Sequence, residues 1–337
     1  MKATIMDVAQ QAGVSPSTVS RVIHDSGRIS LETKTKVRRA MEELGYVPNA
    51  AASSLAGKTP RTIGLVLPNN AGDLFKNPFF INAMRGISIY AQERGYMLLY
   101  SFSNDEEDEV NFIRNYLKSG WVSGIVLLTV RNNDRCIAYL KAADFPFVVI
   151  GHPENPMSTC WVDNDNFQAM YQVTTYLFEK GRRRIGFIGG PSSFRVTQDR
   201  LSGYLQALHV RGIPVDENLI YTGPDFSEGS GREGAEFIFS NEGPDAVATT
   251  DDQLAFGLLD YLEERGKSEV AVTGFNNTVR GIYQRPALTT VDVNPDLLGQ
   301  KAAELLIQLL ETEKSERASL FPNHYLVDTK MIIRETV

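Results

Sequence analysis

From Thr62 to the C-terminus, short apolar runs alternate with stretches that have the apolar spacing of amphipathic helices. The apolar runs are IGLVL at 63–67, YMLLY at 96–100, GIVLL at 124–128, FVVI at 147–150, IGFIG at 185–189, AVAT at 246–249 and VAVTGF at 270–275. The helix-period stretches are 79–94, 105–119, 166–180, 198–211, 228–240 and 253–266. This alternation predicts parallel strands covered by helices on both faces. Two such blocks in series predict two doubly wound subdomains with a ligand between the C-terminal strand ends.

The composition is that of an ordinary globular protein that stays in a reducing compartment. Of 337 residues, 42% are hydrophobic and 22% are charged, which excludes disordered and fibrous classes. The sequence has neither a stretch of about 20 apolar residues nor an apolar segment near its start, so we expect no membrane span and no secretory signal. Cys136 and Cys160 are too few for a disulfide framework, and we expect a cytoplasmic protein.

The net charge of −7 conceals a division of charge along the chain. Residues 1–61 hold nine Lys or Arg against five Asp or Glu, a net charge of +4, whereas 62–337 hold 25 against 36, a net charge of −11. A basic segment attached to an acidic body is typical of a nucleic-acid-binding module.

The basic segment has the pattern of a helix-turn-helix. Thr4 and Ser15 stand at helix N-cap positions, Pro16 follows as a first helical residue, and Ser30 caps a third helix that runs to Leu44. The second helix leaves mostly small polar side chains outward, namely Pro16, Ser17, Thr18, Ser20, Arg21 and His24. Such a face fits the major groove, where Arg21 can bind guanine O6 and N7. The alternative is a structural three-helix lid whose serines serve only as caps.

The stretch 49–57 contains one large apolar side chain among its alanines and serines. Asn49 can cap a short helix there, but a helix with only Leu55 to bury is marginal by itself. We therefore expect a hinge helix that folds on binding DNA, with Leu55 as a wedge between base steps in the minor groove. A plain linker is the alternative.

These stretches resemble the lactose/galactose repressor (LacI/GalR) family. The likeness lies in IMDVAQQAGVSPSTVSRVI, in GYVPNAAASSLAG, and in the later motifs RRRIGFIGGP, TTDDQLAFGLLDYL and RPALTTVDVN. It implies a homodimer that binds a palindromic operator through paired recognition and hinge helices. The DNA-binding residues that we expect are Thr4, Ser15, Pro16, Ser17, Thr18, Ser20, Arg21, His24, Arg28, Asn49, Ala52 and Leu55. His24 replaces a frequent asparagine of the family.

The resemblance also implies the domain organisation. We expect an all-α DNA-binding domain at 1–47, a hinge helix and linker at 48–61, and an α/β core at 62–337 that is similar to periplasmic sugar-binding proteins. The chain of that core is expected to cross three times between its halves. Subdomain one is then expected at about 62–161 and 292–320, and subdomain two at about 162–291 and 321–337.

Effector contacts are carried over from the family residue by residue. They are Phe79, Phe80, Asp163, Arg200, Phe226, Asp251 and Asn276, with Asp252 as a structural neighbour of Asp251. For the phenylalanines, the alternative role is packing in the core. For Arg200, the alternative role is an ion pair with Asp199 or another surface acid. Carboxylate, amide and guanidinium groups with aromatic faces suit a neutral polyol.

The sequence therefore predicts a repressor of a carbohydrate-utilisation operon that a sugar releases from its operator. The segments GFNNTVRGIYQRPALTTVDVN and VVIGHPEN resemble maltose-operon repressors, which implies maltose or a maltodextrin as effector. No nucleophile–base pair or metal spacing is apparent among the four histidines, so we expect neither an enzyme nor a cofactor. Alternatives are a family member whose DNA binding a purine or phosphoprotein corepressor promotes, and a sugar sensor without regulation.

Overall fold

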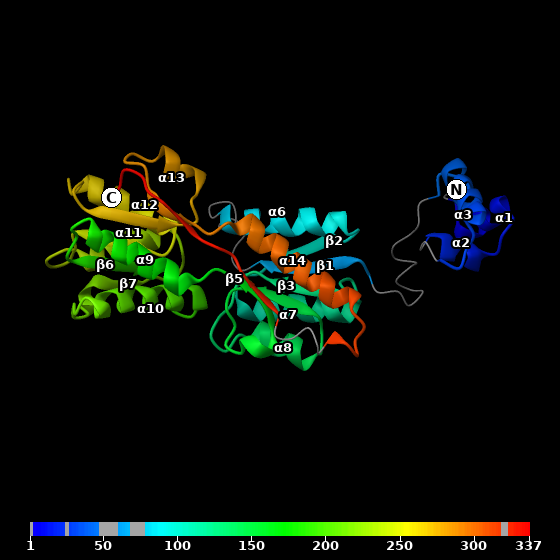
Figure 1. Cartoon of the computed structure of the whole chain (residues 1–337), viewed down its shortest axis with the longest axis horizontal. Helices are drawn as coiled ribbons and strands as arrows, with labels where there is room; N and C mark the ends of the chain where they lie inside the picture. The colour runs from blue at the N-terminus through cyan, green and yellow to red at the C-terminus, as the bar shows by residue number, and fades with distance from the viewer. Residues whose placement is uncertain (1–2, 24–26, 47–59, 68–77, 318–322) are drawn as a thin grey trace. The chain divides into compact units, whose positions relative to one another are not determined.

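The computed structural model describes residues 3–23, 27–46, 60–67, 78–317 and 323–337. Residue contacts divide the chain into two units, Met1–Pro60 and Arg61–Val337. Figure 1 shows a helical N-terminal unit and a C-terminal unit with two sheets. Within the described ranges, no helix has both the length and the apolar character needed to cross a membrane.

The described residues of the N-terminal unit form three helices, α1 (Ile5–Ala12), α2 (Pro16–Ile23) and α3 (Leu31–Glu43). The Thr4 hydroxyl accepts from the Asp7 amide, and the Asp7 carboxylate accepts from the Thr4 amide, which forms a capping box at α1. The three helices share one small core, made of Val8, Ala9, Val19, Val22, Val37 and Ala40. The expected caps and apolar faces are therefore present. The apolar faces pack α1 against α2.

The first sheet of the C-terminal unit is entirely parallel. Its strand order is β11 (His324–Leu326), β5 (Cys160–Asp163), β4 (Phe147–Ile150), β3 (Gly124–Leu127), β1 (Thr62–Leu67) and β2 (Met97–Phe102). One face packs on α6 (Pro78–Glu93) and α14 (Pro295–Glu311), and the other on α7 (Glu106–Ser119) and α8 (Arg135–Ala142) (Figure 1).

The second sheet has the same plan with one reversed edge strand. Its strand order is β12 (Lys330–Ile332), β10 (Thr289–Asp292), β9 (Ala271–Phe275), β8 (Ala246–Thr249), β6 (Ile185–Gly189) and β7 (Ile220–Thr222), and only β12 runs antiparallel. Its faces pack on α9 (Asn166–Glu179) with α10 (Arg195–Val210), and on α11 (Glu228–Ile238) with α12 (Asp252–Glu264). A short helix, α13 (Val279–Tyr283), follows β9. The predicted pair of doubly wound subdomains is confirmed.

The chain passes between the two sheets three times, after β5, after β10 and after β11. The side chain of Asn164, which is 5% exposed, joins the three passages. Its Nδ2 donates to the carbonyls of Val293 at 3.1 Å and Val327 at 2.9 Å. The Val327 amide donates to the Asp163 carbonyl at 2.8 Å, which closes the junction.

The position of the third passage shows that the expected boundary between the subdomains is wrong. We expected 321–337 in subdomain two, but β11 pairs in parallel with β5 and extends the first sheet. Val327 is buried in the core of subdomain one, so the chain crosses only at 327–329. The expected boundary at 161 is also early, because Val162 and Asp163 still belong to β5. The physical reason is the same: these residues complete the edge of the first sheet.

Glycines bring the covering helices into backbone contact within each subdomain. A Cβ atom on Gly86 of α6 would lie 2.0 Å from the Asp296 carbonyl oxygen, and one on Gly299 of α14 would lie 2.0 Å from the Ala83 carbonyl oxygen. Gly203 places α10 against α9 in the same manner, and Gly257 places α12 against α11. Since no side chain separates these backbones, each helix pair is packed without room to slide.

We expect Asn164→Ala to lower the free energy of unfolding by about 1–3 kcal/mol for each carbonyl that loses its donor. Urea denaturation of the full chain measures this change. Asn115→Ala, on the exposed side of α7, is the matched control, and we expect it to stay within about 0.5 kcal/mol of the wild type. An Asn164→Ala value as small as that of the control would contradict the bridging role.

Candidate functional site

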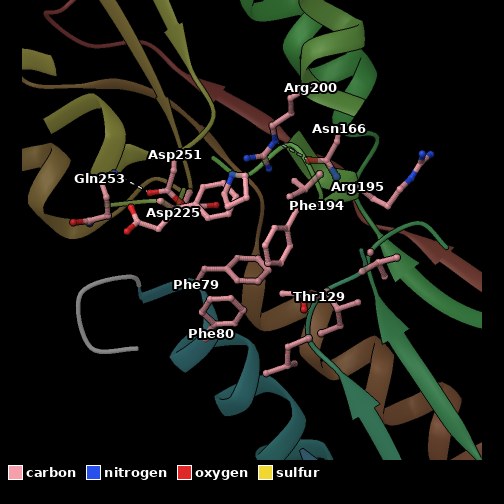
Figure 2. A pocket seen from close by; sticks show the side chains of 18 of the residues that line it. Phe79, Phe80, Thr129, Asn166, Phe194, Arg195, Arg200, Asp225, Asp251 and Gln253 are labelled. Atoms are coloured by element: carbon pink, nitrogen blue, oxygen red, sulfur yellow. Dashed lines mark hydrogen bonds between the residues drawn. The ribbon is translucent and has the colours of Figure 1, made fainter. Parts of the chain in front are cut away.

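A cavity of about 440 Å³ lies between the two sheets of the C-terminal unit. It is lined by loops that follow strands of both sheets, including 128–130 after β3, 163–166 after β5, 224–229 after β7 and Asn276 after β9. In open α/β sheets the crevice beyond the carboxyl ends of the strands is the usual ligand site. The cavity is therefore where the fold places a binding site (Figure 2).

All seven predicted effector residues line this cavity. They are Phe79, Phe80, Asp163, Arg200, Phe226, Asp251 and Asn276. The three phenylalanines also pack against the apolar cores, and Phe79 contacts the cores of both subdomains. These rings therefore take part in core packing and also line the cavity. That these residues bind a ligand remains a prediction.

Arg200 of α10 is buried and held by two neutral acceptors. Its Nε donates to Asn166 Oδ1 at 3.0 Å, its Nη1 donates to the Thr250 carbonyl at 2.5 Å, and its Cζ lies 4.0 Å from the centroid of the Phe275 ring. Burial lowers the pKa of Arg200 to about 10, while nearby carboxylates act in the opposite direction. The guanidinium therefore stays charged at neutral pH in a fixed orientation at the cavity wall. The ion pair of Asp199 is with Arg195, at 3.4 Å.

The tandem carboxylates Asp251 and Asp252 face different surroundings. Asp251 is the N-cap of α12, and it accepts from the Gln253 amide and from Asn276 Nδ2, both at 2.8 Å. Asp252 accepts from Thr290 Oγ1 at 2.6 Å and from the Thr278 amide at 2.7 Å, and it lies outside the cavity lining. Asp251 thus lines the cavity as a pre-oriented acceptor, and Asp252 holds the loop behind it.

Asp163 ends β5 at the junction between the subdomains. Its Oδ1 accepts from the Asn164 amide at 2.8 Å and from Asn166 Nδ2 at 2.9 Å. Burial raises the pKa of Asp163 to about 7, against the opposing effect of these hydrogen bonds and of Arg200. This carboxyl group therefore changes its charge near neutral pH at the cavity wall.

Sequence reasoning missed several residues that line the cavity. The polar and aromatic ones are Thr129, Asn164, Asn166, Phe194, Arg195, Asp225, Ser227, Glu228 and Gln253. Asp225 Oδ1 accepts from the Ser227 amide at 2.9 Å and from Ser230 Oγ at 2.6 Å. Its carboxylate shapes the start of α11, which begins at Glu228. Their position after predicted strands could have identified them, because most of these residues follow a strand of one of the two sheets.

Several of the predicted DNA-binding residues lie around the start of α2. Ser15 Oγ accepts from the Thr18 amide at 3.2 Å and contacts the Ser17 and Thr18 hydroxyls at 2.8 and 2.9 Å. Thr4, Ser15, Ser17, Arg21 and Arg28 are exposed, and Pro16, Thr18 and Ser20 are half-buried. His24, Asn49, Ala52 and Leu55, with most of the expected hinge 48–61, lie outside the described residues. DNA contact by all of these residues remains a prediction.

Two architectural features together define the class of protein. A three-helix unit of the helix-turn-helix type precedes two doubly wound subdomains that enclose a polar and aromatic cavity. Within the described part of the chain, no three His, Cys, Asp or Glu side chains gather as a metal site requires. This architecture is that of a DNA-binding protein with a ligand-binding core.

Comparisons with known proteins agree with this architecture. Residues 4–49 match the family of bacterial regulatory proteins called the lacI family, and residues 60–330 match the periplasmic binding proteins and sugar binding domain of the LacI family. The HTH-type transcriptional regulator MalR of Streptococcus pneumoniae serotype 4 is 38% identical over 94% of this chain and 95% of its own.

Two solved structures extend the likeness to the whole chain. The complex of the transcriptional regulator CelR with cellobiose has a TM-score of 0.76 and 31% identity, and the match covers 99% of this chain and 100% of that one. The lac repressor dimer bound to operator and an anti-inducer has a TM-score of 0.84 and 25% identity, over 100% and 99% of the two chains. The chain therefore belongs to the LacI family of transcriptional regulators, whose members are not enzymes.

We expect Asp163→Asn to gain stability over the wild type as the pH rises from about 4 to about 7. An unfolded aspartate loses its proton near pH 4, whereas native Asp163 keeps it to about pH 7. The native state thus binds more protons within this window, and the stability that Asp163 contributes falls as the pH rises. Thermal unfolding at pH 5 and pH 8 measures the difference.

The control for this prediction is Asp165→Asn at the N-cap of α9, two residues away. Its stability relative to the wild type should not follow the same pH window. Equal stability differences for Asp163→Asn at the two pH values would contradict the raised pKa.

Proposed function

We propose that this regulator is a repressor of a carbohydrate operon and that a neutral sugar of the maltose class controls its binding to DNA. The observation that carries the proposal is the cavity, where hydrogen-bonding side chains of fixed orientation alternate with phenylalanines. Sugars require both, since their hydroxyls need donors and acceptors while their C–H faces need apolar cover.

The charges around the cavity support a neutral effector over an anionic one. Asp225, Glu228 and Asp251 line it with carboxylates, and Arg195 and Arg200 line it with guanidinium groups. Glu228 pairs with Arg280 at 2.6 Å, and Asp163, with a pKa of about 7, is partly protonated at neutral pH. In Figure 2 the Arg195 side chain points away from the middle of the cavity, and Arg200 points toward it. A phosphosugar or nucleotide would add negative charge next to the carboxylates of Asp225 and Asp251, which disfavours it.

A disaccharide is supported by the size of the cavity and by the relatives. A volume of about 440 Å³ is within the usual range for ligand pockets. The relatives include a regulator named MalR and a CelR structure solved with cellobiose. We propose Arg200, Asp251 and Asn276 as polar contacts for the hydroxyls, and Phe79, Phe80 and Phe226 as the apolar cover. Asp163 contributes a further polar contact.

The DNA-binding part of the proposal rests on α2. It would enter the major groove through Ser17 and Arg21, with Thr4, Ser15, Pro16, Thr18, Ser20, His24 and Arg28 as further contacts. Asn49, Ala52 and Leu55 would act at the minor groove. A homodimer on a palindromic operator is proposed as the DNA-bound form, which associates the protein with the nucleoid in the cytoplasm.

Exposed apolar side chains support the homodimer. Ile89 and Met97 are 56% and 62% exposed on α6 and the edge strand β2, and Tyr283 on α13 is 73% exposed. Met97 lies on an edge strand of the first sheet, and a second copy of the chain can cover such an edge with its exposed apolar side chains. Sugar binding would change the relative orientation of the two subdomains and hence the spacing of the two hinges in the dimer.

We expect Arg200→Lys and Asp251→Asn to raise the Kd for maltose at least ~10-fold, because each change leaves a buried polar group without its partner. Isothermal calorimetry measures the Kd, and operator titration should show DNA affinity unchanged in the absence of sugar. Arg211→Lys, at the exposed far end of the same helix, is the control. Unaltered maltose binding in both variants would refute the site, and enhanced DNA binding with a purine would favour the corepressor alternative.

We expect Arg21→Ala to weaken binding to a duplex selected by the wild-type protein by about 1–3 kcal/mol, and binding to a scrambled duplex by much less. Fluorescence anisotropy at fixed salt measures both affinities. Arg39, exposed on α3 and paired with Glu43, provides the control Arg39→Ala. Equal losses on both duplexes would show that Arg21 contacts only phosphates.

A further inference from the structure

Two loops from opposite subdomains pair with each other beside the cavity. The loop 130–132 follows β3, and the loop 193–195 leads into α10; together we call them the inter-subdomain clamp. Arg131 and Phe194 form an antiparallel bridge. The Asn132 amide donates to the Ser193 carbonyl and the Arg195 amide donates to the Val130 carbonyl, both at 3.0 Å.

The clamp replaces a cap that α10 lacks. Phe194 occupies the N-cap position, and its side chain makes no capping hydrogen bond. The first amides of a helix have no partner within the helix and normally receive one from a polar N-cap side chain or water. Here the first amide of α10, from Arg195, finds its acceptor in Val130 of the other subdomain. Separation of the clamp would therefore expose this helix end to water.

Arg131 holds the clamp from the side of subdomain one. Its Nη1 and Nη2 donate to the two oxygens of Glu109 at 2.8 and 2.7 Å, and both side chains are largely buried. Asp134 accepts from the Arg131 amide at 3.1 Å. Because this pairing fixes the plane of the guanidinium, Arg131 presents one face to the Phe194 ring, with 4.8 Å between Cζ and the ring centroid.

The clamp is continuous with the cavity wall. Thr129, Val130, Phe194 and Arg195 all line the cavity. The Phe194 ring also meets Phe226 edge to face, with 6.0 Å between the ring centroids. A ligand that packs on these rings therefore acts on the segment that Arg131 holds in place.

We propose that Arg131 is a positioning residue that fixes Phe194 and the start of α10 across the two subdomains. Through this contact, ligand in the cavity favours the joined arrangement of the clamp. The positioning stands on the clamp geometry, and only its link to sugar rests on the proposed function. Sugar binding and pairing of the two loops then stabilise each other, as linkage requires.

Hydrogen exchange tests the clamp without any ligand. In Arg131→Lys and in Phe194→Leu, peptides covering 128–134 and 190–197 should exchange roughly 3- to 30-fold faster, the range given by the loss of a cation–π contact. Lysine keeps the charge but loses the planar, bidentate geometry. Arg135→Lys breaks the exposed Arg135–Glu107 pair between α8 and α7 and should leave both peptides unchanged. Unaltered exchange in both clamp variants overturns the proposal.

Maltose provides the second arm of the experiment. In the wild type, maltose should slow hydrogen exchange in both clamp peptides. In Arg131→Lys, the Kd for maltose, measured by calorimetry, should rise by about the same factor as the exchange rate of these peptides. A Kd equal to that of Arg135→Lys overturns the link between clamp and ligand. If maltose does not bind the wild type, the proposed effector is wrong, and the exchange arm still decides whether Arg131 positions the clamp.

Discussion

The C-terminal unit depends on one buried side chain that joins the three passages between its subdomains. Asn164 donates to two carbonyls from distant parts of the chain. Its neighbours Asp163 and Asn166 line the cavity and hydrogen-bond to each other. Since an unpaired buried polar group is costly, these hydrogen bonds keep the three passages together, and under the proposed function the subdomains would reorient around them. The cavity therefore has its hinge and part of its polar lining in the same short segment.

The polar lining is held in place by hydrogen bonds within the protein. Arg200 is held by Asn166 and Thr250, and Asp251 by Gln253 and Asn276. These contacts join the start of α9, the interior of α10 and the ends of β8 and β9. A group fixed in this way loses little conformational entropy on binding.

The sequence predicted the parts of the fold with continuous apolar runs and missed those without them. Strands such as β1 and β4 are buried on both faces, so an unbroken run of apolar residues marks them. In contrast, β10 contains TTVD and β11 is fully exposed, and periodicity alone did not indicate either. The missed β11 produced the wrong boundary at 320. Family resemblance supplied the seven predicted effector residues, all of which line the cavity. Phe194 was missed because a phenylalanine at an N-cap position has no sequence pattern that marks it.

The glycine contacts between covering helices have a consequence for how force passes through the molecule. Backbones that touch at Gly86 and Gly299 cannot shear past each other as helices separated by long side chains can. The covering helices of each subdomain are therefore constrained to move together. Strand β1, which follows the N-terminal unit in the chain, belongs to one of these constrained subdomains. Under the proposed function, a movement of that subdomain would carry the start of β1 with it.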